Sequence, residues 1–572
     1  MFSIGAYRRP TRPGAKDPTR MLQAKGAQRE NSLISLLTEV DGLACSSIGI
    51  DRSSVVVISR RNVMLQGAVI GAGVIASSIP GMKALAAGQP PERRTLEGLA
   101  WNDPIVATYR DAVGLLKQKS AADKTGWAGL AAIHGLNPGA YKFCPHGNWY
   151  FLPWHRAYIL TYERIIRQLT NNDDFALPYW DWTTNPTMPE VFLDPKTKDG
   201  KPNWLYVDDN DFQQDWKRTW PATDPMPSRF VGPAVLQDIL QAPDYESFGT
   251  SRPRGQDSLD ASWVLKRTGL QGTLERLPHN MVHNSIGGWM PSAMSPRDPI
   301  FFMHHCNLDR LWAVWNSLGN SNSDDHFWKD MTFTDNFVNP DGSSYSPKVS
   351  ELASPETLGY TYGLPSTSIV ATSFPNLIAL QGKLVTLHAS GVPKSPDVKT
   401  FTASPSGLDF GTISNPLTVP VSVDAGLIAA VSRRRPVSSG TEFLNFAAAR
   451  EQRATGARVF AFVRDVATTQ PQNTEFRVFL DHPGLNAQTP VSDPGYVGSF
   501  GIFVHGEHGG HGGGDANPSF ALDLTGAMQR VYAGGQPPSG KIDLQFIPVP
   551  IAPNDPVGTL RPGAVEIAFV NA

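Results

Sequence analysis

The chain has 572 residues, of which 41% are hydrophobic and 18% charged, and this balance excludes a short disulfide-stapled domain, a collagen and a wholly disordered chain. Its formal net charge is −2, so no overall positive charge indicates a nucleic-acid partner. Its three cysteines are too few for a disulfide framework, and its length predicts two or three domains.

A pair of arginines followed by an uncharged, Gly- and Ala-rich run marks residues 59–86. Arg60 and Arg61 open the run and small residues close it at Ala86, which is the pattern of a twin-arginine export signal. We therefore expect cleavage after Ala86, a periplasmic or secreted protein, and no stable membrane anchor. A transmembrane anchor is the alternative, which the glycines and the proline within the run disfavour. Residues 1–58 show no periodicity and are left unassigned.

Helical spacing dominates the next part of the chain. Residues 105–118 place apolar side chains three and four positions apart. Most of 101–315 is expected to be helical, with long loops at 184–260 that are rich in Pro, Asp and Trp. These features predict a mainly α-helical core over residues 87–364.

The end of the chain changes to a period of two. Residues 365–455, rich in Ser, Thr and Pro, are expected to be a linker that exposes the basic triplet Arg433–Arg435. Beyond them, apolar and polar residues alternate in short segments between Gly, Pro and Asn turns. This pattern predicts an antiparallel β-sandwich over 456–572. Its expected strands are 457–466, 474–481, 495–504, 520–525, 542–549 and 564–570.

The first group of histidines lies around a predicted helix. Pro153 is suited to the start of that helix, on which His155 shares the apolar stripe with Ile159. His146 lies nine residues before His155, and nine helical residues turn through about 900°, which ends on the opposite face. His146 must therefore reach the same point from the preceding loop, and His134 is placed to add a third nitrogen from an earlier helix.

The second group of histidines uses two further helices. His279 and His283 are four residues apart, so they lie on one helix face. The Asp-Pro pair at 298–299 is expected to begin the next helix, on which His305 and Asp309 face the same way.

Six of the 13 histidines thus recur as two sets of three within apolar helices. Buried imidazoles without partners are unfavourable, and a shared metal ion supplies the missing partner. Imidazole suits Zn, Cu, Fe and Ni, but structural zinc more often uses cysteine and catalytic zinc needs only one such set. Two all-histidine sets without a carboxylate therefore favour a pair of copper ions.

Two long motifs carry a resemblance to a known family. One is the His-x4-Phe-x-x-Trp-His-Arg run from His146 towards Glu163, and the other is Asp-Pro-x-Phe-Phe-x-x-His-x3-Asp from Asp298 to Asp309. They resemble the copper motifs of the type 3 copper family, which comprises tyrosinases, catechol oxidases (polyphenol oxidases) and molluscan hemocyanins. The similarity covers roughly 93–362 and implies a four-helix bundle around a dicopper site. The C-terminal β region is similar to the shielding domain of plant polyphenol oxidases.

The resemblance implies two copper ions as cofactors and O2 as co-substrate. In the His304-His305 pair the second residue fits the motif spacing, which leaves His304 as a packing or outer residue. Asp309 is expected to orient a ligand imidazole, and the alternative is an ion pair with a neighbour such as Arg310. The copper ligands that the resemblance implies are His134, His146 and His155 for the first ion and His279, His283 and His305 for the second.

Two other positions match features of the family. The segment Tyr360–Tyr362 resembles its Tyr-x-Tyr motif, which pairs with an arginine near the start of the core, and Arg93 or Arg94 would serve. Cys144 lies two residues before His146, and some members of the family join a cysteine at this spacing to that histidine through a thioether bond. We favour the thioether here over a free buried thiol.

The resemblance also bears on the choice of substrate. In the family, a water held by a Glu and an Asn helps a phenol to lose its proton, and Glu275 and Asn280 match these positions. The alternative is a surface carboxylate and a surface amide. Plant enzymes often place a bulky Phe over the second copper, whereas this chain has Ser292, Ala293 and Met294, which are expected to leave an open substrate entrance. Both features favour a tyrosinase over a strict catechol oxidase.

The expected function is therefore ortho-hydroxylation of monophenols and oxidation of o-diphenols to o-quinones, with phenolic small molecules and O2 as partners. The alternatives are a catechol oxidase or o-aminophenol oxidase without monophenolase activity and, from another class, a hemocyanin-like oxygen carrier. The β region is expected to cover the site in a latent enzyme, which cutting near Arg433–Arg435 would activate. His505, His508 and His511 lie in a Gly-rich loop; we take them as incidental, with transient copper capture as the alternative.

Overall fold

The structure is a computed structural model of the chain. It describes residues 90–571, with gaps. The longest gaps in this description are 365–378, 388–396, 433–455, 504–516 and 534–539. The predicted export signal, the basic triplet and the Gly-rich histidine loop all lie outside the described residues. Within the described part, no helix is both long and apolar enough to cross a membrane.

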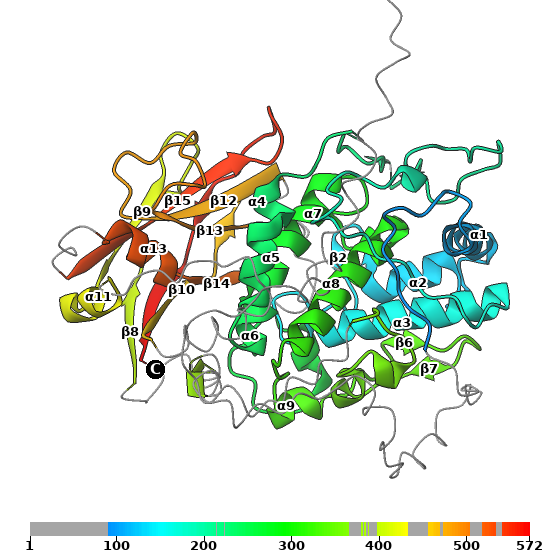
Figure 1. Cartoon of the computed structure of the whole chain (residues 1–572), viewed down its shortest axis with the longest axis horizontal. Coiled ribbons are helices and arrows are strands. Elements are labelled where there is room, and N and C mark those ends of the chain that lie inside the picture. Colours follow the sequence, from blue (N-terminus) through cyan, green and yellow to red (C-terminus); the bar gives the residue numbers. More distant parts are fainter. Residues whose placement is uncertain are drawn as a thin grey trace, which may run out of the picture. The chain divides into compact units, whose positions relative to one another are not determined.

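The first part of the described chain is helical, as predicted (Figure 1). Helix α1 spans Pro104–Gln118 and matches the periodic segment of the sequence. Five elements carry histidines of the two predicted groups: α2 (Trp127–His134), α3 (Phe151–Thr170), the π-helix η5 (Glu275–His279), α7 (Asn280–Ile286) and α8 (Ile300–Ser317). Short helices lie between and after them: α4 (Ser228–Val231), α5 (Pro233–Leu240), α6 (Tyr245–Phe248) and α9 (His326–Lys329).

Helices α3 and α8 form the centre of the helical part, since both are buried on nearly all sides. Pro153 is tolerated in α3 because it lies in the first turn, where its missing N–H would have had no helical partner. Asn171 ends α3 in the left-handed conformation at φ 51°. The Asp298 side chain caps α8 by accepting a hydrogen bond from its first amide at 3.0 Å. The two helices meet where Tyr162 stacks on Phe302 at 3.5 Å between ring centroids.

A buried ion network joins the two ends of the helical core. Arg93 donates hydrogen bonds to Glu163 at 2.8 Å, to Asp309 at 3.2 Å and to the Tyr362 hydroxyl at 3.1 Å. Its guanidinium lies 3.6 Å from the centre of the Tyr360 ring. The predicted pairing of the Tyr-x-Tyr motif with an arginine is therefore confirmed, and Arg93 is that arginine.

Asp309 belongs to this ion network and does not act as predicted. Its carboxylate accepts hydrogen bonds from Arg93, Arg156 and both tyrosines of the motif. Arg310, the alternative partner, pairs with Asp181 at 3.2 Å instead. The prediction that Asp309 orients a ligand imidazole is wrong, because two buried arginines and two hydroxyls already use the lone pairs of its carboxylate.

The C-terminal part consists of two main sheets whose buried side chains share one hydrophobic cluster with α11 (Ala425–Ser432) and α13 (Thr525–Val531). The six predicted strands are all present, displaced by a few residues at most. One sheet has the order β5-β14-β10-β17-β8: Leu270–Gln271, Ser519–Asp523, Arg458–Arg464, Ala564–Val570 and Val398–Ala403. The other has the order β13-β12-β15-β9: Tyr496–Phe500, Thr474–Leu480, Lys541–Pro550 and Leu417–Ser422.

The segment predicted as a linker contributes to both sheets. Strand β8 pairs antiparallel with β17, and β9 pairs antiparallel with β15. The prediction of a linker is therefore wrong for residues 398–432. The alternation of buried and exposed residues in β9 is complete, but it rests on Thr, Pro and Ser at the exposed positions, a composition that is typical of loops.

The helical and β parts contact each other directly. Leu270 and Gln271 of the helical part pair in parallel with β14 and so extend the five-stranded sheet. Arg229 of α4 also forms an ion pair at 2.8 Å with Glu475 of β12, whose side chain is fully buried. The helical core followed by a C-terminal β region is confirmed, while the four-helix bundle and the β-sandwich stay predictions.

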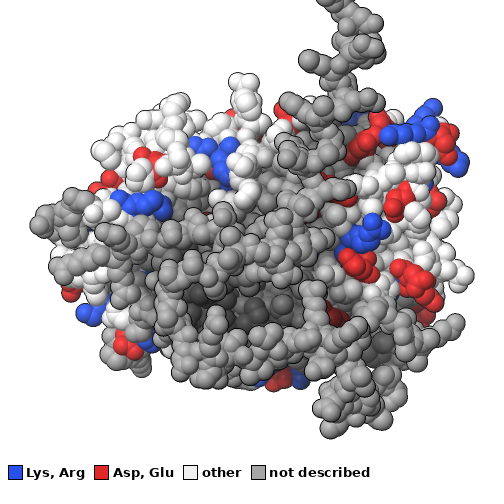
Figure 2. Space-filling model, viewed as in Figure 1, with Lys and Arg blue, Asp and Glu red and all other residues white. Residues whose placement is uncertain are grey.

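The described surface mixes both signs of charge. On the face drawn in Figure 2, basic and acidic side chains lie interspersed among the residues that are not grey. Two of the exposed pairs are Lys198 with Glu190 and Lys217 with Asp208. Exposed pairs of this kind contribute little to stability.

Candidate metal centre

The first histidine cluster comes from three successive segments, as the sequence predicted. His134 is the last residue of α2, His155 lies in α3, and His146 reaches in from the turn between the two helices. These three and Cys144 keep one ligand atom each within 4.8 Å of one another. The ring of His146 lies 5.6 Å from that of His134 and 5.7 Å from that of His155, between centroids.

The second histidine cluster lies on η5, α7 and α8. His279 is the last residue of η5, and its ring lies 4.6 Å from that of His283 in α7. Helix α8 adds His304 and His305, and the four residues again keep one ligand atom each within 4.8 Å of one another. Pro278 lies inside η5, where its missing N–H agrees with the wider π-helical turn.

The two clusters adjoin. The rings of His155 and His305 are stacked with their centroids 4.3 Å apart, and those of His146 and His279 are 5.4 Å apart. Helices α3 and α8 therefore bring together histidines that are far apart in the sequence (Figure 1).

Oxygen atoms fix the proton of four rings on Nδ1. The acceptors are the carbonyl of Ala293 for His134 at 2.6 Å, of Phe151 for His155 at 2.8 Å and of Met290 for His283 at 2.7 Å, and the Asn280 side chain for His279 at 2.8 Å. Each ring therefore presents an unprotonated Nε2. In the described part of the chain, the Nε2 atoms of His134 and His279 are buried without a hydrogen-bond partner.

The surroundings keep these imidazoles neutral. Burial lowers the pKa of all seven histidines of the two clusters, and at several rings the neighbouring imidazoles lower it further. For His155 and His283 the pKa falls to about 3. A neutral imidazole with a free lone pair is the form that binds a metal ion. The orphaned Nε2 atoms and the all-imidazole donor sets fit two copper ions.

The chain matches known proteins over this centre. Residues 124–318 match the family model for the common central domain of tyrosinase. A tyrosinase from Hahella sp. (strain CCB-MM4) is 29% identical over 325 residues, which are 48% of this chain and 64% of that protein. A chloroplastic polyphenol oxidase from Vitis vinifera is 29% identical over 354 residues, which are 56% of this chain and 55% of that protein.

Residues 124–318 therefore resemble the central domain of the type 3 copper family. The chain spans 64% of the length of the Hahella tyrosinase and 55% of the length of the Vitis vinifera polyphenol oxidase. Among solved structures, a latent aurone synthase (polyphenol oxidase) superposes with a TM-score of 0.54 at 19% identity, over 84% of this chain and 90% of that chain. A latent apple tyrosinase gives 0.53 at 20% identity, over 86% and 99%. These two structures show the same fold, a helical core followed by a C-terminal domain.

Within this dicopper centre, the contacts of His304 and His305 differ. His304 accepts a hydrogen bond at Nδ1 from the Trp182 indole at 3.3 Å, so its proton lies on Nε2. His305 instead has its Nε2 3.3 Å from that of His283, which suits two imidazoles bonded to one metal ion at about 2.0–2.1 Å each. These contacts favour His305 as the ligand, in agreement with the motif spacing.

Cys144 lies against the first cluster. Its sulfur is 3.3 Å from Nε2 of His155 and 3.6 Å from both nitrogens of His146. Equal distances to the two nitrogens place the sulfur on the plane that bisects the His146 ring through Cε1. Burial raises the pKa of the Cys144 thiol, so the free residue would be a neutral thiol.

Glu275 and Asn280 are buried beside the centre rather than on the surface. Glu275 accepts hydrogen bonds from the Gly147 amide at 2.7 Å and from the Thr250 hydroxyl, and burial raises the pKa of its carboxyl to about 8. The Asn280 amide donates to Gln271 at 2.9 Å and to the Gly501 carbonyl at 2.8 Å. A water shared by Glu275 and Asn280 stays a prediction, since both hydrogens of that amide are engaged here.

The three residues predicted at the substrate entrance are buried. Ser292, Ala293 and Met294 are 8%, 1% and 8% exposed. Ala293 orients the first cluster through its carbonyl bond to His134, and Met294 packs in a small apolar cluster that includes Trp289. Their role at an entrance stays a prediction.

The sequence analysis expected the β region to cover the centre, but it did not identify the residues that do so. Phe503, which follows β13, packs its ring 4.4 Å from His283, 4.9 Å from His146 and 5.5 Å from His279, between centroids. The Asn284 amide donates to the carbonyl of Ile502 at 3.1 Å. No local pattern marks these contacts, because they join positions more than 200 residues apart.

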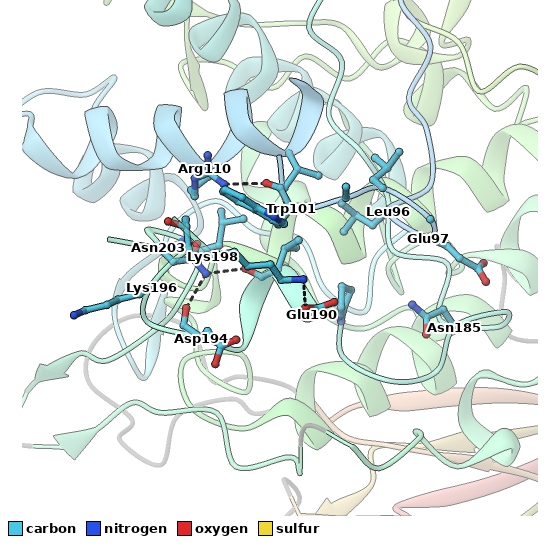
Figure 3. A pocket seen from close by; sticks show the side chains of 18 residues that line it. Leu96, Glu97, Trp101, Arg110, Asn185, Glu190, Asp194, Lys196, Lys198 and Asn203 are labelled. Atoms are coloured by element: carbon cyan, nitrogen blue, oxygen red, sulfur yellow. Dashed lines mark hydrogen bonds and ion pairs between the residues drawn. The ribbon is translucent and has the colours of Figure 1, made fainter. Parts of the chain in front are cut away.

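A separate cavity of about 520 Å³ lies between the start of α1 and residues 185–205. In Figure 3 the Trp101 ring lies along one side of it, and Lys198 reaches Glu190 across another. None of the histidines of the two clusters lines this cavity. It therefore has no part in the dicopper centre.

Proposed function

We propose that this chain is a copper-dependent phenol oxidase that hydroxylates monophenols at the ortho position and oxidises o-diphenols to o-quinones. The observation that carries the proposal is the pair of adjoining, buried histidine clusters, in which the Nε2 atoms of His134 and His279 have no hydrogen-bond partner among the described residues. The six ligands in this proposal are His134, His146 and His155 for one copper and His279, His283 and His305 for the other. A four-helix arrangement of α2, α3, α7 and α8 would hold them.

The pair of copper ions, when bound, supplies the redox chemistry with O2. The chain itself excludes water, since the ligand rings are at most 4% exposed. It also fixes ring orientation through the four Nδ1 bonds, so the ligands need little rearrangement when the metal binds.

Glu275 is the group that we assign to the phenolic proton. A phenol has a pKa near ~10 and must lose its proton to bind through oxygen. The Glu275 carboxyl, with its raised pKa, is poised to accept that proton near neutral to mildly alkaline pH. The Gly147 amide and the Thr250 hydroxyl hold it against the turn that carries His146.

The C-terminal region would keep the enzyme latent. The Phe503 ring lies against histidines of both clusters, where a phenol ring would have to bind. Two hydrogen bonds to the backbone of Gly501 hold its segment in place: the Gly501 N–H donates to the Arg276 carbonyl at 2.8 Å, and the Asn280 side-chain amide donates to the Gly501 carbonyl. Removal of this segment, by cutting near 433–435 or otherwise, would open the centre.

Oxygen uptake by the copper-loaded full chain tests these assignments. We would compare tyramine and dopamine before and after protease, and in a Phe503→Ala variant, with the exposed Phe212 changed to Ala as the matched control. Uptake on both substrates after opening would support a tyrosinase, and uptake on dopamine alone would demote the enzyme to a catechol oxidase. Uptake on an o-aminophenol, without uptake on tyramine, would favour the alternative of an o-aminophenol oxidase. Reversible O2 binding without oxidation of any of these would favour an oxygen carrier.

The thioether between Cys144 and His146 is the second part of the proposal, supported by the equal distances of the sulfur to both ring nitrogens. Joining the thiol sulfur to a ring carbon removes one hydrogen from each partner, and O2 at the dicopper centre would accept the two electrons. Intact-mass measurement after copper and O2 exposure would show the loss of two hydrogen atoms. A Cys144→Ser variant is the control that should keep its mass.

A further inference from the structure

One turn of the chain supplies an orienting carbonyl to each of the two histidine clusters. The Met290 carbonyl accepts the Nδ1 hydrogen bond of His283, a member of the second cluster, at 2.7 Å. The Ala293 carbonyl accepts that of His134, a member of the first cluster, at 2.6 Å. The two carbonyls belong to residues only three positions apart, so whatever fixes this turn also fixes one ring in each cluster.

Hydrogen bonds within the turn meet at the backbone of Trp289. The Trp289 carbonyl accepts from the Ser292 amide at 3.0 Å and from the Ser292 hydroxyl at 2.8 Å. The hydroxyl oxygen of Ser292 in turn accepts from the Met294 amide at 3.1 Å. The Ala293 amide, between these two residues, donates to the Pro138 carbonyl at 2.9 Å. The backbone from 289 to 294 is therefore cross-linked into one unit that contains both orienting carbonyls.

The Trp289 side chain fastens this unit to the rest of the helical part. Its fully buried ring stacks on that of Trp216, with the centroids 3.9 Å apart and the planes at 8°. Its indole N–H donates to the Asp209 carboxylate at 3.0 Å, and the Arg297 guanidinium lies 4.5 Å from the ring centre. Gly288 permits this approach, because a Cβ there would lie 2.3 Å from the Trp216 carbonyl oxygen. A large ring held by stacking, a hydrogen bond and a cation fixes the backbone that carries it.

We propose that Trp289 is a positioning residue shared by both copper ions, which sets the orientation of His134 and His283 through the two carbonyls of its turn. This inference rests on the dicopper centre of the proposed function. Without the anchored ring both carbonyls shift together. Each imidazole then loses the bond that keeps its proton on Nδ1, so that Nε2 is no longer held free and aimed at the metal. Both copper ions bind less tightly as a result.

The test measures the affinity of the full chain for Cu+ at both sites, by competition with a chelator. Trp289→Leu should weaken binding at each site about tenfold. Trp289→Phe should restore part of the affinity at both sites, because it keeps a ring for stacking and loses only the N–H. The matched control is Trp315→Leu. Trp315 is equally buried, stacks on Phe248 of α6 at 4.7 Å and donates its indole N–H to the Ala242 carbonyl at 3.1 Å. Its loss should lower the free energy of unfolding and leave both copper affinities unchanged.

Nitrogen NMR of the copper-free chain with labelled histidine gives a second readout, the position of the ring proton. His134 and His283 should carry it on Nδ1 in the parent chain and show a mixture with Nε2 in Trp289→Leu. Unchanged tautomers, a loss of affinity at one site only, or an equal loss in Trp315→Leu would overturn the proposal. A chain that binds two copper ions but oxidises no phenol would instead contradict the proposed function. Both readouts would still decide the role of Trp289, because neither depends on turnover.

Discussion

The first histidine cluster is assembled from three separate segments, whereas the second lies on one continuous helical stretch and one further helix. In the first, a turn carries His146, and the carbonyl of Ala293 from another part of the chain orients His134. In the second, spacing along η5 and α7 places His279 and His283, and the C-terminal region contacts the neighbouring Asn280 and Asn284. The first cluster thus depends on long-range backbone contacts, and the second on helix geometry and the covering segment.

The largest expected effect tests which histidine of α8 completes the second cluster. His305→Ala should lose one of the two copper ions and lower phenol oxidation by more than about a hundredfold. His304→Ala is the matched control, and it should keep both ions because its Nδ1 is bonded to Trp182 rather than free for a metal. Metal analysis and oxygen uptake on both variants check this. Loss of copper from His304→Ala but not from His305→Ala would reverse the assignment.

A change at Asp309 should lower the free energy of unfolding of the helical core that holds both clusters. Asp309→Asn leaves the buried Arg93 and Arg156 without their shared counter-charge, and breaking such a pair costs about 3–5 kcal/mol. Denaturant unfolding of the copper-free chain would measure this, with Asp111→Asn at an exposed pair as the control. Both copper ions should still bind under native conditions, and selective loss of one would mean that Asp309 does orient a ligand.

A glycine next to His134 allows the first cluster to be weakened alone. A Cβ on Gly135 would lie 2.1 Å from the Ala293 oxygen, which is the acceptor that orients the His134 ring. Gly135→Ala should therefore lower the affinity for the first copper about 10- to 100-fold and leave the second unchanged. Gly407→Ala, where a Cβ meets open space, is the control. Equal loss of both ions in copper titrations would show that the clusters are not independent.

The sequence predicted the local parts of this molecule and missed the long-range ones. Periodicity located α1 and the strands from β10 onward, and the motif spacings selected the histidines, because both depend on near neighbours. Asp309 was misread because its partner Arg93 lies 216 residues away. Strands β8 and β9 were hidden by a loop-like composition.

The contact of Phe503 with the histidines could not be predicted for the same reason. The Asn280 amide and the Gly501 carbonyl that fasten this segment are 221 residues apart, and no periodic signal reports a pairing of that kind.

The smallest expected effect is the pH dependence that Glu275, next to the first cluster, gives to monophenol oxidation. A carboxyl with a pKa raised to about 8 by burial is neutral below that pH and able to accept a proton above it. The ratio of monophenol to diphenol oxidation in the opened enzyme should therefore rise with pH and level off. Glu275→Gln should remove this rise and lower the ratio several-fold, because the amide accepts no proton.

A change at Thr250 tests independently whether the pKa of Glu275 sets this pH dependence. Its hydroxyl donates to the Glu275 carboxyl and so lowers the pKa that burial raises. Thr250→Val removes the donor, so the midpoint of the ratio should move to higher pH while the amplitude stays the same. Bound copper cations shift both midpoints downward, but they leave the direction of the difference unchanged. A midpoint that moves to lower pH in Thr250→Val, or a ratio with the same pH profile in Glu275→Gln, would mean that another group takes the phenolic proton.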